Sequence, residues 1–555
     1  MKKLILSAFA IIPALAAQAQ SPVDAMALSQ TELRGSARFM SMGGAFTALG
    51  ADLSVLGQNP AGIGMYRGSD IGLTLGIDIN SDKAQYDGGS RSESNTLANI
   101  NNAGYVGTYM LGDNNDYSIS WGFSYNRLYR FNRTYMGNNI PMQSSVTNYF
   151  AGLTNGYSPN DLLDEAPNDP YNNWSQDAPD WMSVLLYNSG MINCETSIDD
   201  HGDLVLHDQY RGLWQWGGVD GLGNKVNPTS GFADFRITER GHADEYNISL
   251  GGSVMNLVYW GLGVGITDLD FTREYSYTEH SMERALIPAP TAGYELGDVK
   301  YANLYSRQHI WGTGANFKIG AIIKPINELR IGLAVHTPTY YSLSSSSYGD
   351  TRFFYSNGFS GEESTPYDDY SFQLNNPWKV MAGVAGVIGG RAIISVDYQY
   401  DAYGNMKLKY DDGNNMVANN DNIQRYYKGT NTVRAGLEYR ITPQLSARLG
   451  CNFSSTASKS LIKDANTSAQ QTSEISTAGQ NPSFLANNNT RYITAGLGYK
   501  VQGFYFDLAY VNKHSTAQFN AYTPFVDYDD AWAIAPTAKL THNSSQIVAS
   551  IGFRF

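Results

Sequence analysis

The sequence contains only two cysteines among 555 residues, Cys194 and Cys451, and they lie far apart in the chain. Their number and spacing form neither a disulfide framework nor a metal-binding pattern, so we expect two unpaired thiols. Charged residues are also scarce, at 16% of the chain, whereas glycine and tyrosine are abundant, with 56 and 39 copies. This composition disfavours a soluble α/β enzyme and is typical of amphipathic strands with aromatic girdles.

Sequence motifs of catalysis are missing as well. No G-x-S-x-G, H-E-x-x-H, C-x-x-C or P-loop pattern occurs, and only His201 and His207 form a close pair of histidines. We therefore expect no enzyme activity and no cofactor. Binding of haem or a metal by this pair is an alternative to the simpler interpretation, two histidines in a surface loop. The net charge of −13 argues against nucleic acid as a partner.

Long apolar runs are also absent, because no stretch reaches the roughly 18 consecutive residues that a membrane-spanning helix requires. The chain begins instead with Lys2 and Lys3, a short apolar stretch and an A-x-A site at residues 17–19. Together these features predict a signal peptide over residues 1–19. No cysteine follows the site, which argues against a lipoprotein. An exported chain of this kind is periplasmic, secreted or an outer-membrane barrel.

Lysine and arginine do not occur in residues 134–210, where eleven acidic residues supply −11 of the net −13. A solvated acidic surface loop is one interpretation. The other is a divalent cation bound near Asp199, Asp200 and Asp203, because hard cations prefer several oxygen ligands close together. No EF-hand spacing accompanies these residues.

What the chain does contain is a series of segments in which apolar and polar residues alternate. In residues 117–126, aromatic and aliphatic side chains at odd positions alternate with Ser, Gly and Asn at even positions. Such alternation predicts a strand with one apolar face. We expect fourteen strands, at residues 70–80, 100–111, 116–130, 243–255, 257–275, 302–324, 329–343, 377–389, 391–410, 429–441, 445–456, 490–501, 503–513 and 544–555.

The connections between these strands alternate strictly between short and long. The long connections fall near 81–99, 131–242, 276–301, 344–376, 411–428, 457–489 and 514–543. Short turns at one end, long loops at the other and an even strand number are the pattern of outer-membrane barrels, whereas a soluble sandwich gives no reason for it. The predicted fold class is therefore all-β, a 14-stranded antiparallel transmembrane β-barrel over residues 67–555.

Residues 34–65 differ from the strands, because they are rich in Gly, Ala and Ser and contain Asn59-Pro60-Ala61-Gly62. A small-residue segment with short helices ahead of a barrel predicts an N-terminal hatch, or plug, over residues 20–66. Pro60 fixes its own φ and biases Asn59 towards an extended conformation. Gly62 and Gly64 are expected to permit a tight turn into the first strand.

The strand faces predicted to line the lumen carry charged residues. The main candidates form a ladder of Lys318, Arg330, Arg434, Glu438 and Arg448, to which Lys379, Asp397, Asp507 and Arg554 belong as well. Unpaired charges are costly in a dry interior, so we expect them to pair with one another or with Glu32, Arg34 and Asp52 of the hatch. A ladder that stabilises the wall and a path that guides solutes are both consistent with this pattern.

Two further features concern the wall and the outer loops. Glycines 263 and 265, followed by a change of apolar phase between Ile266 and Leu269, predict a register bulge or an opening in the wall. The long insertion at about 131–242 contains helical candidates near 142–153 and 181–187. Their apolar residues are expected to cap the barrel mouth or to pack within the loop itself.

The chain ends on an alternating strand that closes with Phe555. A terminal aromatic residue of this kind resembles the signal that the barrel-assembly machinery recognises, so we expect that machinery as a partner. Outer-membrane lipid is the second expected partner, and we expect a monomer.

Several of these features together resemble one family. The NPAG segment at 59–62, the fourteen strands, and the paired segments 316–321 and 329–338, similar to "KxGxxxxP" and "RxGxxxxSP", resemble the FadL-type outer-membrane transporters, in a Bacteroidetes-like form. The resemblance implies a hatch that contains Asn59, Pro60 and Ala61, and a hydrophobic ligand that diffuses through without an energy-coupling segment. An acidic mouth departs from this precedent, because it repels carboxylates unless cations screen it.

The function expected from the sequence is outer-membrane transport, by facilitated diffusion, of small hydrophobic molecules such as long-chain fatty acids. The alternative is a surface receptor that binds haem, a host molecule or a nutrient with its long acidic loop. A barrel lipase and a general porin are the remaining hypotheses; the first lacks a Ser/His constellation and the second requires an open lumen.

Overall fold

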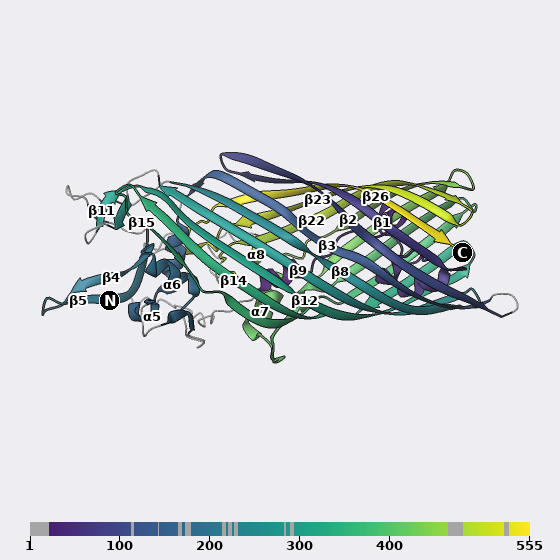
Figure 1. The fold of residues 1–555 in the computed structure, drawn as a ribbon, viewed down its shortest axis with the longest axis horizontal. Helices are drawn as coiled ribbons and strands as arrows, with labels where there is room; N and C mark the ends of the chain where they lie inside the picture. The colour runs from purple at the N-terminus through teal and green to yellow at the C-terminus, as the bar shows by residue number, and fades with distance from the viewer. Residues whose placement is uncertain are drawn as a thin grey trace, which may run out of the picture.

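The computed structural model describes residues 21–112, 116–142, 144–164, 169–172, 179–213, 218–219, 225–226, 231–281, 285–288, 294–463, 475, 481–526 and 532–555. Its main body is one long antiparallel barrel, with the hatch inside one end and folded loops beyond the other (Figure 1). The expected signal peptide, residues 1–19, lies outside the described residues.

Fourteen strands form the barrel wall, as predicted from the sequence, and β1 pairs with β26 to close it. Three of the fourteen are interrupted and carry two labels each. In order around the wall they are β1 (Asp70–Tyr86), β2 (Gly89–Leu111), β3 (Tyr117–Met142), β8 (Gly231–Val254), β9 (Val258–Ser281), β12 (Val299–Ile326), β13 with β14 (Leu329–His336, Tyr340–Tyr355), β17 with β16 (Lys379–Ile388, Asp368–Asn375), β18 with β19 (Ala392–Asp401, Lys407–Tyr410), β20 (Thr430–Arg440), β21 (Leu445–Ser454), β22 (Phe484–Val501), β23 (Phe504–Asn520) and β26 (Thr537–Arg554).

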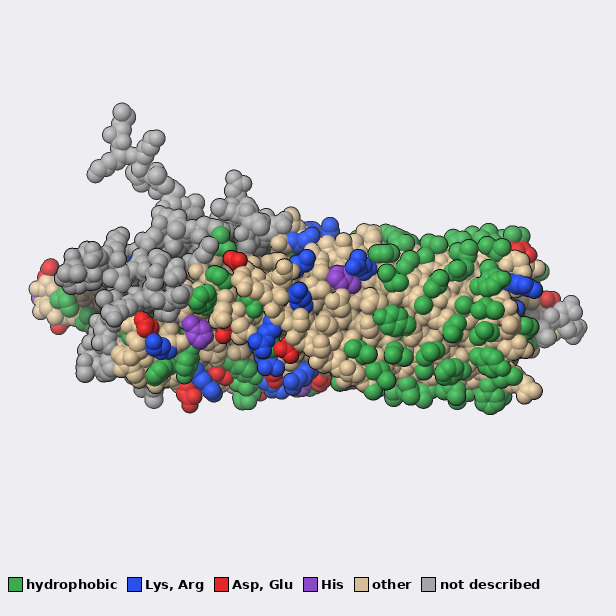
Figure 2. Space-filling view, turned by 90° about the horizontal axis from the view of Figure 1, so that it is seen from above, with side chains coloured by type: hydrophobic (Ala, Val, Ile, Leu, Met, Phe, Trp, Pro, Cys, Tyr) green, Lys and Arg blue, Asp and Glu red, His purple; other side chains and the backbone are tan. Residues whose placement is uncertain are grey.

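An apolar band surrounds the end of the barrel where the turns are short. Figure 2 shows hydrophobic side chains covering this end of the face in view, while charged side chains lie on the surface beyond it. On β9, for example, Trp260, Leu262, Val264 and Ile266 point outward and are 37–50% exposed. Exposed apolar residues repeated on every strand are what a lipid environment stabilises, so this band marks the membrane-spanning part.

The wall strands extend beyond the apolar band, and there their apolar residues point into the barrel instead of outward. On β9 the outward residues become polar after Ile266, while Leu269, Phe271, Tyr275 and Tyr277 point inward and are buried. Water now contacts the outer face, so apolar side chains are stable only inside. Much of the expected long loops is therefore strand, and β1 and β2 meet in a tight turn at 87–88 instead of a loop over 81–99.

The predicted bulge or opening at Gly263 and Gly265 is wrong, and the change in the direction of the apolar residues explains the pattern. Strand β9 pairs with β8 from Val258 to Ser281 without a register shift, and its pairing with β12 is equally regular. The phase change between Ile266 and Leu269 therefore marks the level at which the outer face of the strand leaves the membrane; the wall itself is regular there.

The hatch, residues 21–66, contains α1 (Pro22–Leu28), α2 (Ala37–Ser41), α3 (Val55–Gln58) and η1 (Pro60–Met65). Serine caps begin α1 and α2, where the Oγ atoms of Ser21 and Ser36 accept the backbone N–H groups of Asp24 and Phe39. Almost every hatch residue is buried, and apolar side chains such as Phe46, Leu56 and Ile63 form a hydrophobic cluster with wall residues. The surrounding wall thus supplies the enclosure that these short helices lack on their own.

The connection between β3 and β8 folds over the barrel mouth. It begins after Met142, and its described part contains α4 (Val146–Thr154), α5 (Pro159–Leu162), α6 (Trp181–Asn188), β4 (Ile192–Ile198) and β5 (Leu204–Gly212). The two expected helices near 142–153 and 181–187 are thus confirmed. Residues 144–213 are called the cap below.

Shorter elements complete the described chain. They are η2 (Pro170–Asn172), β6 (Gly218–Val219), β7 (Lys225–Val226), β10 (Ala285–Pro288), β11 (Tyr294–Gly297), β15 (Ser360–Ser364), η3 (Tyr403–Asn405), α7 (Val417–Tyr426), α8 (Ser460–Lys463), β24 (Phe525–Val526) and β25 (Trp532–Ala533). In the part of the chain that the structure describes, none of the helices is long and apolar enough to cross a membrane.

Candidate functional site

The floor of the candidate site is the hatch, which is seated on glycines of the wall. A methyl group at Gly332 would lie 2.1 Å from the Thr47 carbonyl oxygen, and one at Gly450 would lie 2.3 Å from the Gly43 nitrogen. The same close approach to hatch backbone recurs at Gly261, beside Pro60, and at Gly436, beside Met42, while the hatch side chains of Asn59 and Ser41 lie against Gly320 and Gly496. These positions form a glycine collar that lets the hatch backbone contact the wall backbone directly.

The NPAG segment lies at this contact. Asn59 is extended, with φ −135° and ψ 100°, and caps η1 through Oδ1, which accepts the Ala61 N–H at 3.1 Å. Its Nδ2 donates to the Thr47 carbonyl at 2.6 Å and so ties two parts of the hatch together. Gly62 lies within the tight 3-10 turn η1 and has no positive φ. Gly50 and Val55 pack so closely against it that a side chain would not fit.

The lumen charges form contacts that join the wall to the hatch. Glu438 bridges Arg38 of α2 at 2.9 Å and Arg448 at 2.6 Å, and Arg448 continues to Asp507 at 2.5 Å. Arg330 donates to the Leu49 carbonyl of the hatch at 3.0 Å. These contacts favour the interpretation of the ladder as a set of structural anchors around the floor.

Lys318 and Arg434, the other two members of the ladder, lie higher up. Lys318 forms a buried ion pair with Glu245 and also donates to Asn247 at 2.6 Å. Arg434 donates through Nη2 to Gln399 at 2.6 Å, while no partner is recorded for its Nη1 among the described residues. Asp397, below Arg434, accepts the Thr47 N–H at 2.7 Å.

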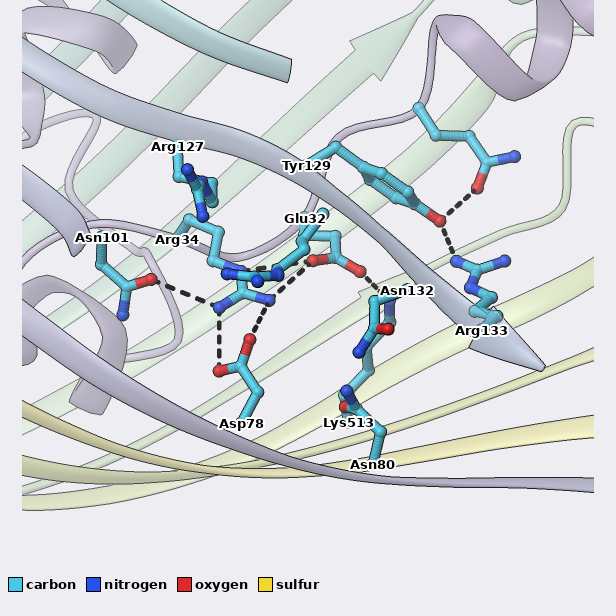
Figure 3. Close-up of polar contacts among 12 residues, drawn as sticks. Glu32, Arg34, Asp78, Asn80, Asn101, Arg127, Tyr129, Asn132, Arg133 and Lys513 are labelled. Atoms are coloured by element: carbon cyan, nitrogen blue, oxygen red, sulfur yellow. Dashed lines mark hydrogen bonds and ion pairs between the residues drawn. The ribbon is translucent and has the colours of Figure 1, made fainter. Parts of the chain in front are cut away.

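A second charge cluster links the start of the hatch to β1 and β23. Figure 3 shows Arg34 between two carboxylates: its Nη1 donates to Asp78 at 3.0 Å and its Nη2 to Glu32 at 3.1 Å. Glu32 also pairs with Lys513, and Arg34 reaches Asn101 at 3.3 Å. Sequence analysis named Glu32 and Arg34 but missed Asp78 and Lys513, because only the register of distant strands brings them together.

Above the floor lies a cavity of about 250 Å³, bounded by the hatch and the wall. Its apolar lining includes Met26, Leu28, Leu33, Phe39, Leu128 and Met381, and its acidic lining is Glu32, Glu245 and Asp401. Seven basic residues also line it: Arg34, Arg127, Arg133, Lys318, Lys379, Arg434 and Lys513. A mixed lining with excess positive charge suits a molecule that has both an apolar and a polar, preferably anionic, part.

The wall beside this cavity has a seam between β2 and β3. The two strands pair only from Asn102 opposite Asn126 to the turn at the band end, and β3 contains a register shift just above, between Arg127 and Tyr129. Beyond that point the two strands are joined by side-chain hydrogen bonds, for example between Asn95 and Asn132 at 2.8 Å. The β3 backbone also donates to side chains of β1, from Thr134 N–H to Asp82 at 2.9 Å and from Asn138 N–H to Tyr86 at 3.1 Å. The backbone pairing of β2 with β3 thus ends near the level where the apolar band ends.

Two prolines interrupt the wall on another side of the cavity. Strand β13 stops before Pro338 and β17 begins after Pro377, while the neighbouring strand β18 stops at Asp401. Thr339 and Asn376 replace the missing ladder contacts, since the Thr339 N–H donates to the Asn376 side chain at 2.6 Å. The Asn376 N–H also donates to the Thr339 carbonyl at 3.2 Å, so backbone pairing continues on this side, whereas no such pairing is recorded between the described residues of β2 and β3 above Asn102.

The cap packs on the outer end of the barrel wall through an apolar core. Leu185 and Leu186 of α6 and Phe150 of α4 pack with wall residues such as Tyr277 and Phe519. Glu279, on β9 well above the apolar band, accepts the Val146 N–H at 2.8 Å and hydrogen-bonds the Ser145 hydroxyl at 2.5 Å, at the start of α4. Burial raises the pKa of Glu279 to about 7.

The predicted cation ligands lie at the tip of the cap, in the turn between β4 and β5. Asp199 Oδ1 accepts the backbone N–H groups of His201 and Asp203 at 2.8 and 2.9 Å, so it stabilises the turn. Within the described ranges, no three His, Cys, Asp or Glu side chains are grouped as metal ligands. The cation site at Asp199, Asp200 and Asp203 stays a prediction without geometric support.

Comparison with known proteins shows the fold. No family model and no curated protein matches the chain. A Pseudomonas aeruginosa FadL homologue of known structure is similar, with a TM-score of 0.50 and 12% identity over 95% of this chain and 100% of that one. The toluene transporters TodX of Pseudomonas putida (TM-score 0.43, 11% identity, 95% and 100% covered) and TbuX of Ralstonia pickettii (0.42, 13%, 94% and 99%) also match. The chain thus has the fold of FadL-type outer-membrane barrels.

Proposed function

We propose that the protein transports small hydrophobic molecules across the outer membrane by facilitated diffusion, with long-chain fatty acids as the leading substrate class. The observation that carries this proposal is the cavity of about 250 Å³, which lies inside a membrane-spanning barrel and is lined by the hatch and the wall. Its apolar and basic lining fits the chain and the carboxylate of a fatty acid.

The mechanism follows from what closes the cavity. The floor is fixed by backbone contacts at the glycine collar and by the ion pairs around Glu438, so its displacement requires many simultaneous changes. At the seam only a few exposed or half-buried side-chain hydrogen bonds, such as the one from Arg91 to Asn138, hold the wall together. A ligand captured under the cap therefore leaves most easily sideways, between β2 and β3.

The experiment that tests the proposal is the identification of lipid that co-purifies with the protein from cells. We expect fatty acids in extracts of the wild type and a loss of most of this material in Met381→Trp, which fills the cavity. Val396→Trp, on the lipid-facing side of β18, serves as the control and should retain it. Recovery of haem, or equal fatty acid in both variants, would contradict the proposal.

A further inference from the structure

The turns at the periplasmic end of the barrel carry a row of basic residues. Four consecutive turns join β12 to β13, β17 to β18, β20 to β21 and β22 to β23, and each has one basic residue in it or shortly before it. Arg391 lies in its turn, whereas Lys324, Arg440 and Lys500 lie near the ends of β12, β20 and β22. The only acidic residue in these turns is Glu328. In the described part of the chain, none of the four cations forms an ion pair, whereas most lumen cations do. These four residues are called the rim cations.

The rim cations belong to a rigid, continuous edge. The Lys324 N–H donates to the Leu257 carbonyl of the preceding turn, and the Arg440 N–H donates to the Arg391 carbonyl, both at 2.8 Å. The Lys500 N–H donates to Gln444 of the next turn at 2.9 Å. Each turn is thus hydrogen-bonded to its neighbour, so the positive charges are held at fixed spacing.

The rim cations lie on the lumen-facing side of their strands and not on the side that faces lipid. Along β20, the residues that face lipid are Val433, Leu437 and Tyr439, whereas Arg440 continues the lumen-facing series that contains Glu438. Lys500 and Lys324 likewise follow the lumen-facing alternation of β22 and β12. Lipid phosphates lie outside the barrel wall. Because the cations are on the lumen-facing side, they line part of the periplasmic opening instead.

Other basic groups increase the positive field of this mouth. Arg67, at the end of the hatch, is exposed, and together with Arg330 it repels the Lys324 ammonium group. Arg554 and Arg440 act in the same way on Lys500, while Asp70 opposes them. The like charges are therefore close enough to act as one surface.

The size of this surface indicates what it binds. Neighbouring turns are two strands apart, roughly 10 Å, and the row from Lys324 to Lys500 spans about 30 Å along the rim. A single carboxylate or phosphate contacts one or two of these cations at most. We propose that the rim cations form a docking surface for the acidic face of a soluble periplasmic protein. Complementary charge over such a distance steers association and fixes orientation.

The test uses the intact protein in nanodiscs of zwitterionic phosphatidylcholine, with fluorescent poly-L-glutamate of about 20 residues as the probe. We expect binding to wild type that weakens at least tenfold in the variant K324Q/R391Q/R440Q/K500Q, and that weakens in 0.5 M salt. The control K83Q/R91Q/K300Q/R352Q changes charge equally at the other end of the barrel and should bind as the wild type does. Equal binding by wild type and rim variant would overturn the proposal.

A second measurement separates a protein partner from anionic lipid. In nanodiscs that contain phosphatidylglycerol, native mass spectrometry counts the lipids retained by each variant. We expect the same number on wild type and rim variant, because the rim cations do not face lipid. Loss of retained phosphatidylglycerol from the rim variant, without any change in poly-L-glutamate binding, would assign the row to the membrane and contradict the proposal.

Discussion

At the scale of single residues, the floor of the site depends on the absence of side chains. Gly450 faces the hatch, and a methyl group there would lie 2.3 Å from both the Gly43 nitrogen and the Met42 carbonyl carbon. We expect Gly450→Ala to lower the free energy of unfolding by about 1–3 kcal/mol, because neither backbone has room to move. Gly386→Ala is the matched control, since its nearest neighbour atom is 3.9 Å away. Equal melting temperatures for both variants would show that the hatch is not seated tightly.

Glu279 gives the cap a predicted dependence on pH. Its pKa of about 7 in the folded protein is above the ordinary value for glutamate, so its protonated form stabilises the cap. That contribution is complete below the ordinary pKa and is lost as pH rises through about 7. Hydrogen-exchange protection factors of α4 should therefore be lower at pH 8 than at pH 5.5. In Glu279→Gln, which cannot ionise, we expect the two values to agree; a persistent difference would assign the effect to another group.

Sequence analysis located the residues of the floor but not their partners. It identified Asn59, Glu438 and Arg448 and the requirement that lumen charges pair, which follows from the cost of a buried charge. The pairing of Lys318 with Glu245 and of Arg34 with Asp78 depends on the strand register and on the path of the hatch. Neither is encoded in local alternation, so these contacts could not be predicted.

At the scale of elements, the fourteen strands were predictable only where lipid surrounds them. The outward apolar residues of the band produce a clear alternation, and every strand core was found. Above the membrane surface the alternation inverts, as between Ile266 and Leu269 of β9, and in β3 a register shift accompanies the inversion. An apolar/polar alternation that inverts within one strand looks like a loop or a bulge in the sequence. For this reason the extensions of β1 to Tyr86 and of β3 to Met142 were not predicted.

The seam between β2 and β3 is the element that we expect to move. The double variant N95C/N132C, made without the native cysteines, joins two side chains that already contact each other across the seam at 2.8 Å. Its oxidised form should reduce fatty acid uptake several-fold, and a reductant should restore it. The control pair Y109C/I119C lies on the same two strands where they are already paired. Full uptake by the oxidised seam variant would exclude a sideways exit at this place.

At the scale of the whole molecule, removal of the cap distinguishes a transporter from a surface receptor. It packs on the barrel through an apolar core and exposes acidic residues and apolar side chains, such as Ile198 and Leu204, at its tip. Replacing residues 146–213 by a short Gly/Ser linker should leave partial uptake, because the cavity lining contains no cap residue. A surface receptor would lose all ligand binding, so uptake assays with labelled palmitate on intact cells distinguish the two functions.

The central claim is that a closed barrel passes hydrophobic molecules. The most direct measurement is the initial rate of labelled palmitate uptake by cells that lack their own transporter and produce this protein. Our account predicts saturable uptake well above the empty-vector rate, and a strong reduction in Met381→Trp, which fills the cavity, but not in Val396→Trp. Uptake at the empty-vector rate, with the protein present and folded in the outer membrane, would contradict it.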